Sequence, residues 1–174
     1  MASALIDASA MVAAFGSQEP EGPRYQDLLA LAALENWMLW TTWPCVVEAT
    51  YLVPPPNRFA LLNWLGRGAV SVFPFDQMAL LDFVPVMQRY TERPRTEMDL
   101  ADASLYQLAA DTGVTRIMTM DRRAFSRHRL PDGGVDRVGG CGPGGSHLHG
   151  ASGEVLGEGG PHLGAARVVD ANEE

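Results

Sequence analysis

Lysine is absent from this chain of 174 residues, and all 13 of its positive charges are arginine. The 21 acidic residues outnumber them, so the formal net charge is −8 at pH 7. A charge of this sign excludes a polybasic protein that holds nucleic acid by bulk attraction. It leaves room for an acidic site that metal ions would neutralise.

Cysteine and long hydrophobic runs are also scarce. Cys45 and Cys141 lie far apart and form no CxxC pair, which argues against a disulfide framework and favours a reducing cytoplasm. The longest apolar run, LLALAALENWMLW, is interrupted by Glu35 and Asn36, so it predicts no membrane span. The N-terminal segment lacks a basic n-region and carries Asp7 within its apolar part, so no signal peptide is predicted. We therefore expect a soluble cytoplasmic protein.

Glycine is distributed unevenly, since 13 of the 18 glycines follow Pro131. Few large apolar side chains occur in that segment, so it cannot bury enough surface to offset the entropy lost on ordering. The sequence therefore predicts a folded domain over residues 1–131 and a mostly disordered, acidic tail over 132–174. Within the tail, only a short strand near 135–138 is expected.

The first 131 residues alternate short apolar runs with amphipathic segments. The predicted strands are 3–7, 41–42 (a strand or a helix cap), 69–73 and 115–120. The predicted helices are 8–15, 25–39, 44–52, 57–65, 76–90, 99–112 and 122–127. Strands that alternate with helices predict an α/β fold with a parallel sheet covered on both faces.

Two of the predicted strands end in an aspartate, Asp7 in SALIDAS and Asp121 in TRIMTMDRRAF. Ligands of open α/β sheets bind at the carboxyl ends of the strands. If the two strands are neighbours, their backbones lie about 4.8 Å apart, and carboxylates so close must share a proton or a cation. Mg²⁺ and Mn²⁺ are the natural partners of such oxygen ligands.

Further acids could join this pair. Glu48 lies among apolar neighbours in the predicted helix PCVVEATYL, and Asp102 follows Asp99 by one turn at the start of another helix. Each acid also has an ordinary structural explanation. A strand-end aspartate often forms a turn or caps a helix, Asp99 could be the cap of its helix, and Glu48 could face solvent.

The order of these acids resembles that of the PIN-domain ribonucleases, and especially of the VapC-like toxins of type II toxin–antitoxin pairs. The segments that carry the resemblance are LIDASAMVAAF, TTWPCVVEAT and MDLADASLYQLAADTGVTRIMTMDRRAFSRHRL. The resemblance implies a PIN-like three-layer sandwich with a central parallel sheet. It also implies an acidic catalytic quartet with a fifth, metal-binding acid; these residues are Asp7, Glu48, Asp102 and Asp121, with Asp99 as the fifth. Ser9 and Thr119 would orient carboxylates through their hydroxyl groups.

The function implied by the resemblance is that of an endoribonuclease dependent on Mg²⁺ or Mn²⁺. The metal ligands would be Asp7, Asp99, Asp102 and Asp121. Arg122 and Arg123 would bind substrate phosphates, although arginines in this position equally suit a solvated surface. The partners implied are an RNA substrate, an antitoxin protein and a second copy of the chain in a homodimer, with no membrane.

Other interpretations remain open. A phosphatase of the haloacid-dehalogenase type also begins with a strand ending in aspartate, but it expects a second aspartate where this chain has Ser9. A catalytically silent PIN-like module that binds RNA or protein is the main alternative.

Two further features of the sequence carry weaker signals. The segment CGPGGSHLHG has metal-ligand residue types in a glycine-rich setting that offers no preorganised geometry. The stripe YQDLLALAALENWMLW fits core packing at helical spacing, but Trp37 and Trp40 at its end exceed what a core face needs and suggest part of a partner groove.

Overall fold

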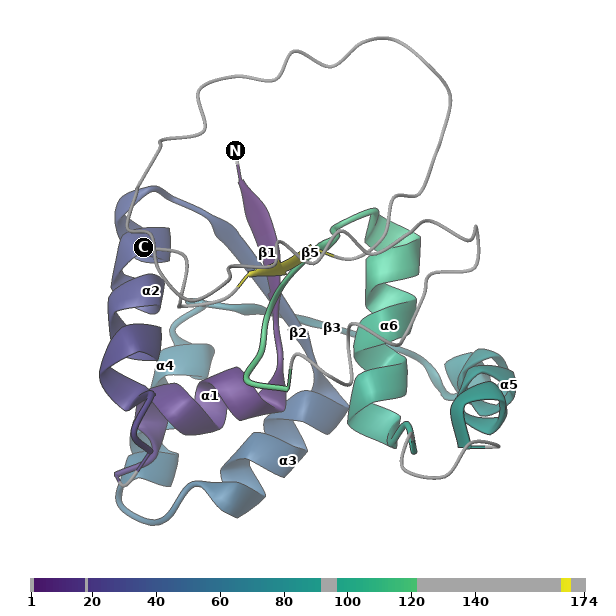
Figure 1. Cartoon of the computed structure of the whole chain (residues 1–174), viewed down its shortest axis with the longest axis horizontal. Coiled ribbons are helices and arrows are strands. Elements are labelled where there is room, and N and C mark those ends of the chain that lie inside the picture. Colours follow the sequence, from purple (N-terminus) through teal and green to yellow (C-terminus); the bar gives the residue numbers. More distant parts are fainter. Residues whose placement is uncertain (1, 18, 92–96, 122–166, 170–174) are drawn as a thin grey trace, which may run out of the picture.

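The computed structural model describes residues 2–17, 19–91, 97–121 and 167–169. Its centre is a sheet of five parallel strands in the order β3-β2-β1-β4-β5 (Figure 1). The strands are β1 (Ser3–Ile6), β2 (Met38–Thr42), β3 (Ser71–Phe73), β4 (Arg116–Met118) and β5 (Arg167–Val169). The α/β architecture and the parallel sheet predicted from the sequence are confirmed.

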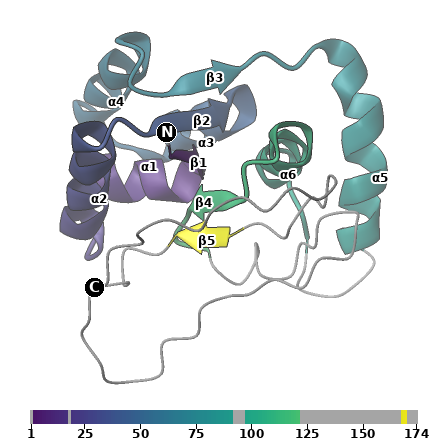
Figure 2. The ribbon, with the colours of Figure 1, turned by 90° about the horizontal axis from the view of Figure 1, so that it is seen from above.

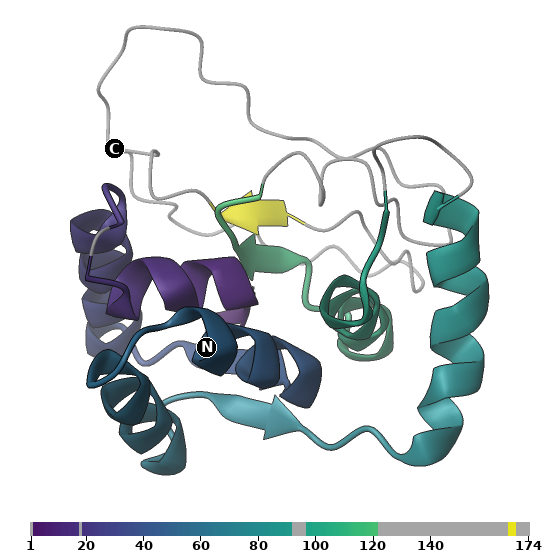
Figure 3. The ribbon, with the colours of Figure 1, turned by 90° about the horizontal axis from the view of Figure 1, so that it is seen from below.

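Helices cover both faces of the sheet. They are α1 (Ala8–Phe15), α2 (Gly22–Leu34), α3 (Trp43–Leu52), α4 (Asn57–Gly66), α5 (Leu80–Thr91), preceded by the 3₁₀ turn η1 (Gln77–Ala79), and α6 (Leu100–Thr112). Helices α1, α2 and α4 lie on one side and α5 and α6 on the other (Figures 2 and 3). Helix α3 contacts both α1 and α6 at the carboxyl end of the strands. No helix in the described part of the chain is long and apolar enough to cross a membrane.

The central strand β1 forms the middle of the core. Ala4, Leu5 and Ile6 are fully buried, and Leu5 pairs with Trp40 of β2 on one side and Ile117 of β4 on the other. A strand covered on both faces needs apolar side chains at every position. A charged residue in the sequence therefore marks the end of such a strand. The apolar run of β1 therefore ends at Asp7, a buried polar residue that follows the strand.

Three helices are capped at their N-termini by the side chain of the residue just before them. Asp7 caps α1 by accepting from the amide of Ala8, Thr42 caps α3, and Asp99 caps α6 by accepting from the amide of Asp102. Gly113 ends α6 with φ of 68°, a left-handed conformation that glycine adopts without strain. The cap that the sequence offered as one explanation of Asp99 is therefore present.

The helix predicted over 25–39 is wrong after Leu34. Helix α2 ends at Leu34, the chain reverses at Asn36 with φ of 56°, and Leu39 belongs to β2. Asparagine tolerates this left-handed conformation, which the periodicity of the apolar residues could not reveal. The two tryptophans therefore share no helix face. Trp37 packs under the Arg116 guanidinium at 4.8 Å, and Trp40 packs against the Phe73 ring at 6.5 Å.

The C-terminal segment also differs from its prediction. The short strand expected at 135–138 lies outside the described residues, as does the helix expected at 122–127. Instead β5, at Arg167–Val169, pairs in parallel with β4 at the edge of the sheet. Its two adjacent valines favour a strand locally, a signal that the glycine-rich composition of the whole segment hid. The boundary at residue 131 and the disorder of the rest of the tail stay predictions.

Candidate active site

Strands β1 and β4 are neighbours, and this pairing brings their carboxyl ends together. Ile6 is paired with Met118, and the backbone amide of Asp7 donates to the carbonyl of Met118 at 3.0 Å. Asp121 follows β4 by three residues. The two strand-end aspartates therefore lie at the same edge of the sheet, as the sequence predicted.

Asp7 is held by a dense set of hydrogen bonds although it is only 6% exposed. Its Oδ1 accepts from the Ala8 amide at 2.6 Å, and its Oδ2 accepts from the hydroxyls of Ser9 at 2.6 Å and Thr119 at 2.8 Å. Burial raises the pKa of Asp7, while these hydrogen bonds act in the opposite direction. The two hydroxyls are the carboxylate-orienting neighbours that the resemblance implied.

The same two hydroxyls also fix the turn that carries Asp121. Ser9 Oγ accepts from the Met120 amide at 2.9 Å, and Thr119 Oγ1 accepts from the Asp121 amide at 3.0 Å. A hydroxyl has one proton to donate, so with both protons directed to Asp7, each oxygen is free to accept from the turn. This network sets the position of one aspartate relative to the other.

Tyr25 of α2 also contacts the turn that carries Asp121, through a hydrogen bond to the backbone. Its ring is 3% exposed, and its hydroxyl donates to the Thr119 carbonyl at 2.7 Å across 94 positions of sequence. Nothing in the spacing of α2 indicated this contact, because the tyrosine reads simply as a residue of the apolar helix face.

We expect Tyr25→Phe to lower the free energy of unfolding by about 1–3 kcal/mol, because the buried Thr119 carbonyl loses its donor. Urea denaturation would measure the change. Tyr51→Phe is the matched control, since Tyr51 is 81% exposed, and it should change stability by less than about 0.5 kcal/mol. Equal stability of Tyr25→Phe and the native protein would show that this hydrogen bond does not hold the turn.

Five acidic residues interact electrostatically at this edge of the sheet. Burial and then the charges of its neighbours raise the pKa of Asp102 to about 8. Burial followed by charge–charge repulsion likewise raises the pKa of Glu48. The neighbouring charges that raise the pKa of Asp102 are those of Asp99, Asp7, Asp121 and Glu48. The acids singled out in the sequence are therefore near enough for four of them to act on the buried Asp102.

The donor set suits a hard divalent cation. Each of the five acids offers carboxylate oxygens, the ligands that Mg²⁺ and Mn²⁺ prefer, and the charges that act on Asp102 are all negative. Among the described residues, no three acidic, histidine or cysteine side chains converge as a ready-made metal site. Nearby like charges disfavour the ionised form of a carboxyl group, and a bound cation would remove that penalty. The residue types fit such an ion, and its binding would require the carboxylates to draw together.

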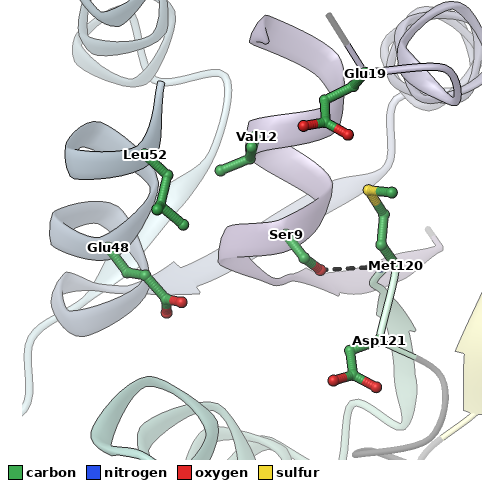
Figure 4. Close-up of a pocket in the computed structure, with 7 residues that line it drawn as sticks. All are labelled: Ser9, Val12, Glu19, Glu48, Leu52, Met120 and Asp121. Atoms are coloured by element: carbon green, nitrogen blue, oxygen red, sulfur yellow. Dashed lines mark hydrogen bonds between the residues drawn. The ribbon is translucent and has the colours of Figure 1, made fainter. Parts of the chain in front are cut away.

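A cleft of about 500 Å³ opens beside two of these acids, and it is lined by Ser9, Val12, Glu19, Glu48, Leu52, Met120 and Asp121. Figure 4 shows Glu48 and Asp121 on opposite sides of the opening, with Ser9 between them and bonded to the turn at Met120. Glu19, in the loop before α2, was not singled out from the sequence, since no periodic pattern marks a loop residue.

Covalent chemistry by cysteine is not supported at this site. Cys45 is fully buried in α3, and burial followed by the charge of Asp7 raises the pKa of its thiol to about 12. A thiol in this state is not the thiolate that a nucleophile requires. The proposed phosphate-binding residues Arg122 and Arg123 lie outside the described residues, as do Cys141, His147 and His149 of the glycine-rich segment.

Comparisons with known proteins support the fold. No family model and no curated protein matches the sequence. Among solved structures, the chain is similar to VapC20 of Mycobacterium tuberculosis, described as a sarcin-ricin loop cleaving toxin, with a TM-score of 0.59. The match has 15% sequence identity and covers 68% of this chain and 90% of that chain. The chain has a PIN-like fold. Identity this low is evidence about the fold alone.

Proposed function

We propose that this protein is a metal-dependent endoribonuclease that hydrolyses RNA phosphodiester bonds as the toxin of a toxin–antitoxin pair. The observation that carries the proposal is the placement of Asp7 and Asp121 after the neighbouring strands β1 and β4, with Glu48 on α3 and Asp99 and Asp102 at the start of α6 near them. The PIN-like fold supports it, because the similar solved structure is described as that of a sarcin-ricin loop cleaving toxin.

In this proposal the acids have distinct roles. Asp7, Asp99, Asp102 and Asp121 would hold Mg²⁺ or Mn²⁺, with Glu48 completing the catalytic quartet from α3. The chemistry supplied by the bound ion is activation of water and stabilisation of charge at the scissile phosphate. Ser9 and Thr119 would keep the Asp7 carboxylate in a fixed orientation. Arg122 and Arg123 would hold the substrate backbone beside the acids, and such contacts position RNA without reading its sequence.

The partners follow from the same proposal. Single-stranded or looped RNA is the substrate class, because its backbone and bases are accessible. An antitoxin protein would hold the enzyme inactive in the cytoplasm, and the active form would be a homodimer.

Induced expression of the native protein without its antitoxin is expected to arrest growth of a bacterial host, whereas expression of Asp121→Asn is not. The variant changes one exposed side chain without altering its size, so both proteins should accumulate in folded form. Colony counts and culture density after induction measure the effect, and immunoblots confirm equal expression. Normal growth with abundant, folded native protein would argue against the toxin assignment and for a silent PIN-like binding module.

A further inference from the structure

We propose that an aromatic hollow near the five acids binds one unstacked nucleobase of the RNA substrate, with Trp43 as its stacking surface. These acids, Asp7, Glu48, Asp99, Asp102 and Asp121, are called the acidic cluster below. The proposal rests on the proposed nuclease function and adds a substrate-binding subsite to it. The hollow has a volume of about 350 Å³ and is distinct from the cleft over Ser9. Its lining residues come from α3, the segment after β3, α5 and the start of α6, elements that lie next to one another in Figure 3.

Helices α3 and α6 contribute residues both to the hollow and to the set of acids. Leu100, which lines it, directly follows Asp99 at the start of α6. Trp43 begins α3, and Glu48 lies five residues further along the same helix, or about 7.5 Å along its axis. An RNA strand with its phosphate at the acids would therefore bring a neighbouring base within reach of the hollow.

The walls are aromatic and firmly packed. Phe73 and Phe75 have ring centroids 4.8 Å apart, and Phe75 meets the buried ring of Phe83 edge-on at 5.1 Å. Trp43 is different, because 58% of its surface is exposed at the rim. Packed aromatic rings beside a largely exposed tryptophan suit the stacking of an unpaired base, and stacking accepts any base.

Polar groups at the rim favour a base over an apolar protein side chain. Asp76 is an exposed residue that accepts the amides of Met78 and Ala79 through Oδ1 alone, and its Oδ2 accepts no hydrogen bond from the described residues. An apolar side chain that filled the hollow would desolvate this carboxylate without a partner, which is unfavourable. The exocyclic amino group of adenine or cytosine would instead donate to it, as amino groups of bases do to acidic side chains. Uracil has no such donor.

RNA-binding measurements with the full-length chain test the subsite without relying on cleavage. The parent protein is Asp121→Asn in Mg²⁺, so that RNA survives, and the probes are fluorescein-labelled 12-nucleotide oligo(A), oligo(C) and oligo(U). We expect Trp43→Leu to weaken oligo(A) binding by about 5- to 150-fold, the equivalent of ~1–3 kcal/mol for one stacked base. Trp43→Phe should retain most of the affinity. Phe59→Leu, which removes an equally exposed ring on α4 outside the hollow, should bind like the parent.

A second variant tests the polar rim. The parent should bind oligo(A) and oligo(C) more tightly than oligo(U), and Asp76→Asn should abolish this preference while keeping the helix cap, since asparagine caps as well as aspartate.

The subsite is wrong if Trp43→Leu binds like the parent, if Phe59→Leu loses as much affinity, or if no probe binds. It is also wrong if sedimentation shows that Trp43→Leu only dissociates a dimer, because the hollow would then be a contact between copies. Cleavage by the native enzyme is assayed separately, so failure of the nuclease proposal is distinguishable from failure of the subsite.

Discussion

Replacing Asp121 by asparagine should reduce RNA cleavage by about 100-fold or more in saturating Mg²⁺. The substitution removes one negative charge from the acidic cluster, so the site loses part of the attraction that holds the cation. Metal ions supply several kcal/mol of transition-state stabilisation, and each 1.36 kcal/mol corresponds to a tenfold change in rate. Initial cleavage rates on a structured RNA, with a thermal melt of each protein, would measure the effect.

Asp111→Asn is the matched control for this prediction. Asp111 lies on α6 like Asp102, but at the opposite end of the helix, where it is exposed and accepts a hydrogen bond from Gln107. Asparagine can still accept that bond, so the variant should cleave RNA at the native rate. Comparable cleavage by Asp121→Asn and Asp111→Asn would contradict the assignment of Asp121 to the site.

Asp7→Asn is a less discriminating variant, although it removes the other strand-end carboxylate. Asp7 Oδ2 accepts two hydroxyl protons, and the hydroxyls of Ser9 and Thr119 in turn accept amides of the Asp121 turn. An asparagine amide placed at Oδ2 would donate where two donors already converge. We therefore expect Asp7→Asn to abolish cleavage and also to loosen the turn, whereas Asp121→Asn leaves this network intact.

The second large effect concerns pH. In the folded protein without metal, Asp102 holds its proton up to a pKa of about 8, whereas in the unfolded chain it releases the proton near 3.8. The folded state therefore binds more protons between pH 4 and pH 8, and stability falls as the pH rises through this window. Burial raises the pKa values of Asp7 and Glu48 too, so both contribute in the same direction.

Asp102→Asn should therefore be more stable than the native protein at pH 8, and the difference should vanish near pH 4. Urea denaturation at a series of pH values in EDTA measures this, with Asp111→Asn as a control that lacks the effect. Added Mg²⁺ should reduce the loss of stability at high pH in the native protein but not in Asp102→Asn. A concentration 100 times the dissociation constant stabilises by about 2.7 kcal/mol, or about 5–10 °C in a chain of this size. A native protein that gains stability from pH 4 to pH 8 in EDTA would contradict the buried, mutually repelling carboxylates.

The placement of the candidate acids could be predicted from the sequence, whereas the hydrogen bonds that hold the turn at Asp121 could not. Asp7 and Asp121 were identifiable because buried parallel strands are continuous apolar runs, so a charged residue marks their end. Asp99 and Asp102 were identifiable from their position at a helix start. The contact of Tyr25 with Thr119 was not, because it joins residues 94 positions apart through one hydroxyl.

The errors in the predicted fold have a common cause. Apolar periodicity continues through Leu34 into β2, and only the left-handed turn at Asn36 separates the helix from the strand. The strand β5 was missed because its short valine pair lies in a glycine-rich segment, and the pairing with β4 depends on a partner distant in sequence. Local composition does not determine either feature, since both depend on tertiary context.

Calorimetric titration of Mn²⁺ into the purified, metal-free protein at pH 7, with RNA cleavage assayed at each point, tests the central claim most directly. We predict that the native protein binds Mn²⁺ at one or two sites, that cleavage rises with occupancy, and that Asp121→Asn loses both together while Asp111→Asn loses neither. No Mn²⁺ binding by the folded native protein, or cleavage that persists in EDTA, would contradict a metal-dependent nuclease built on these five acids.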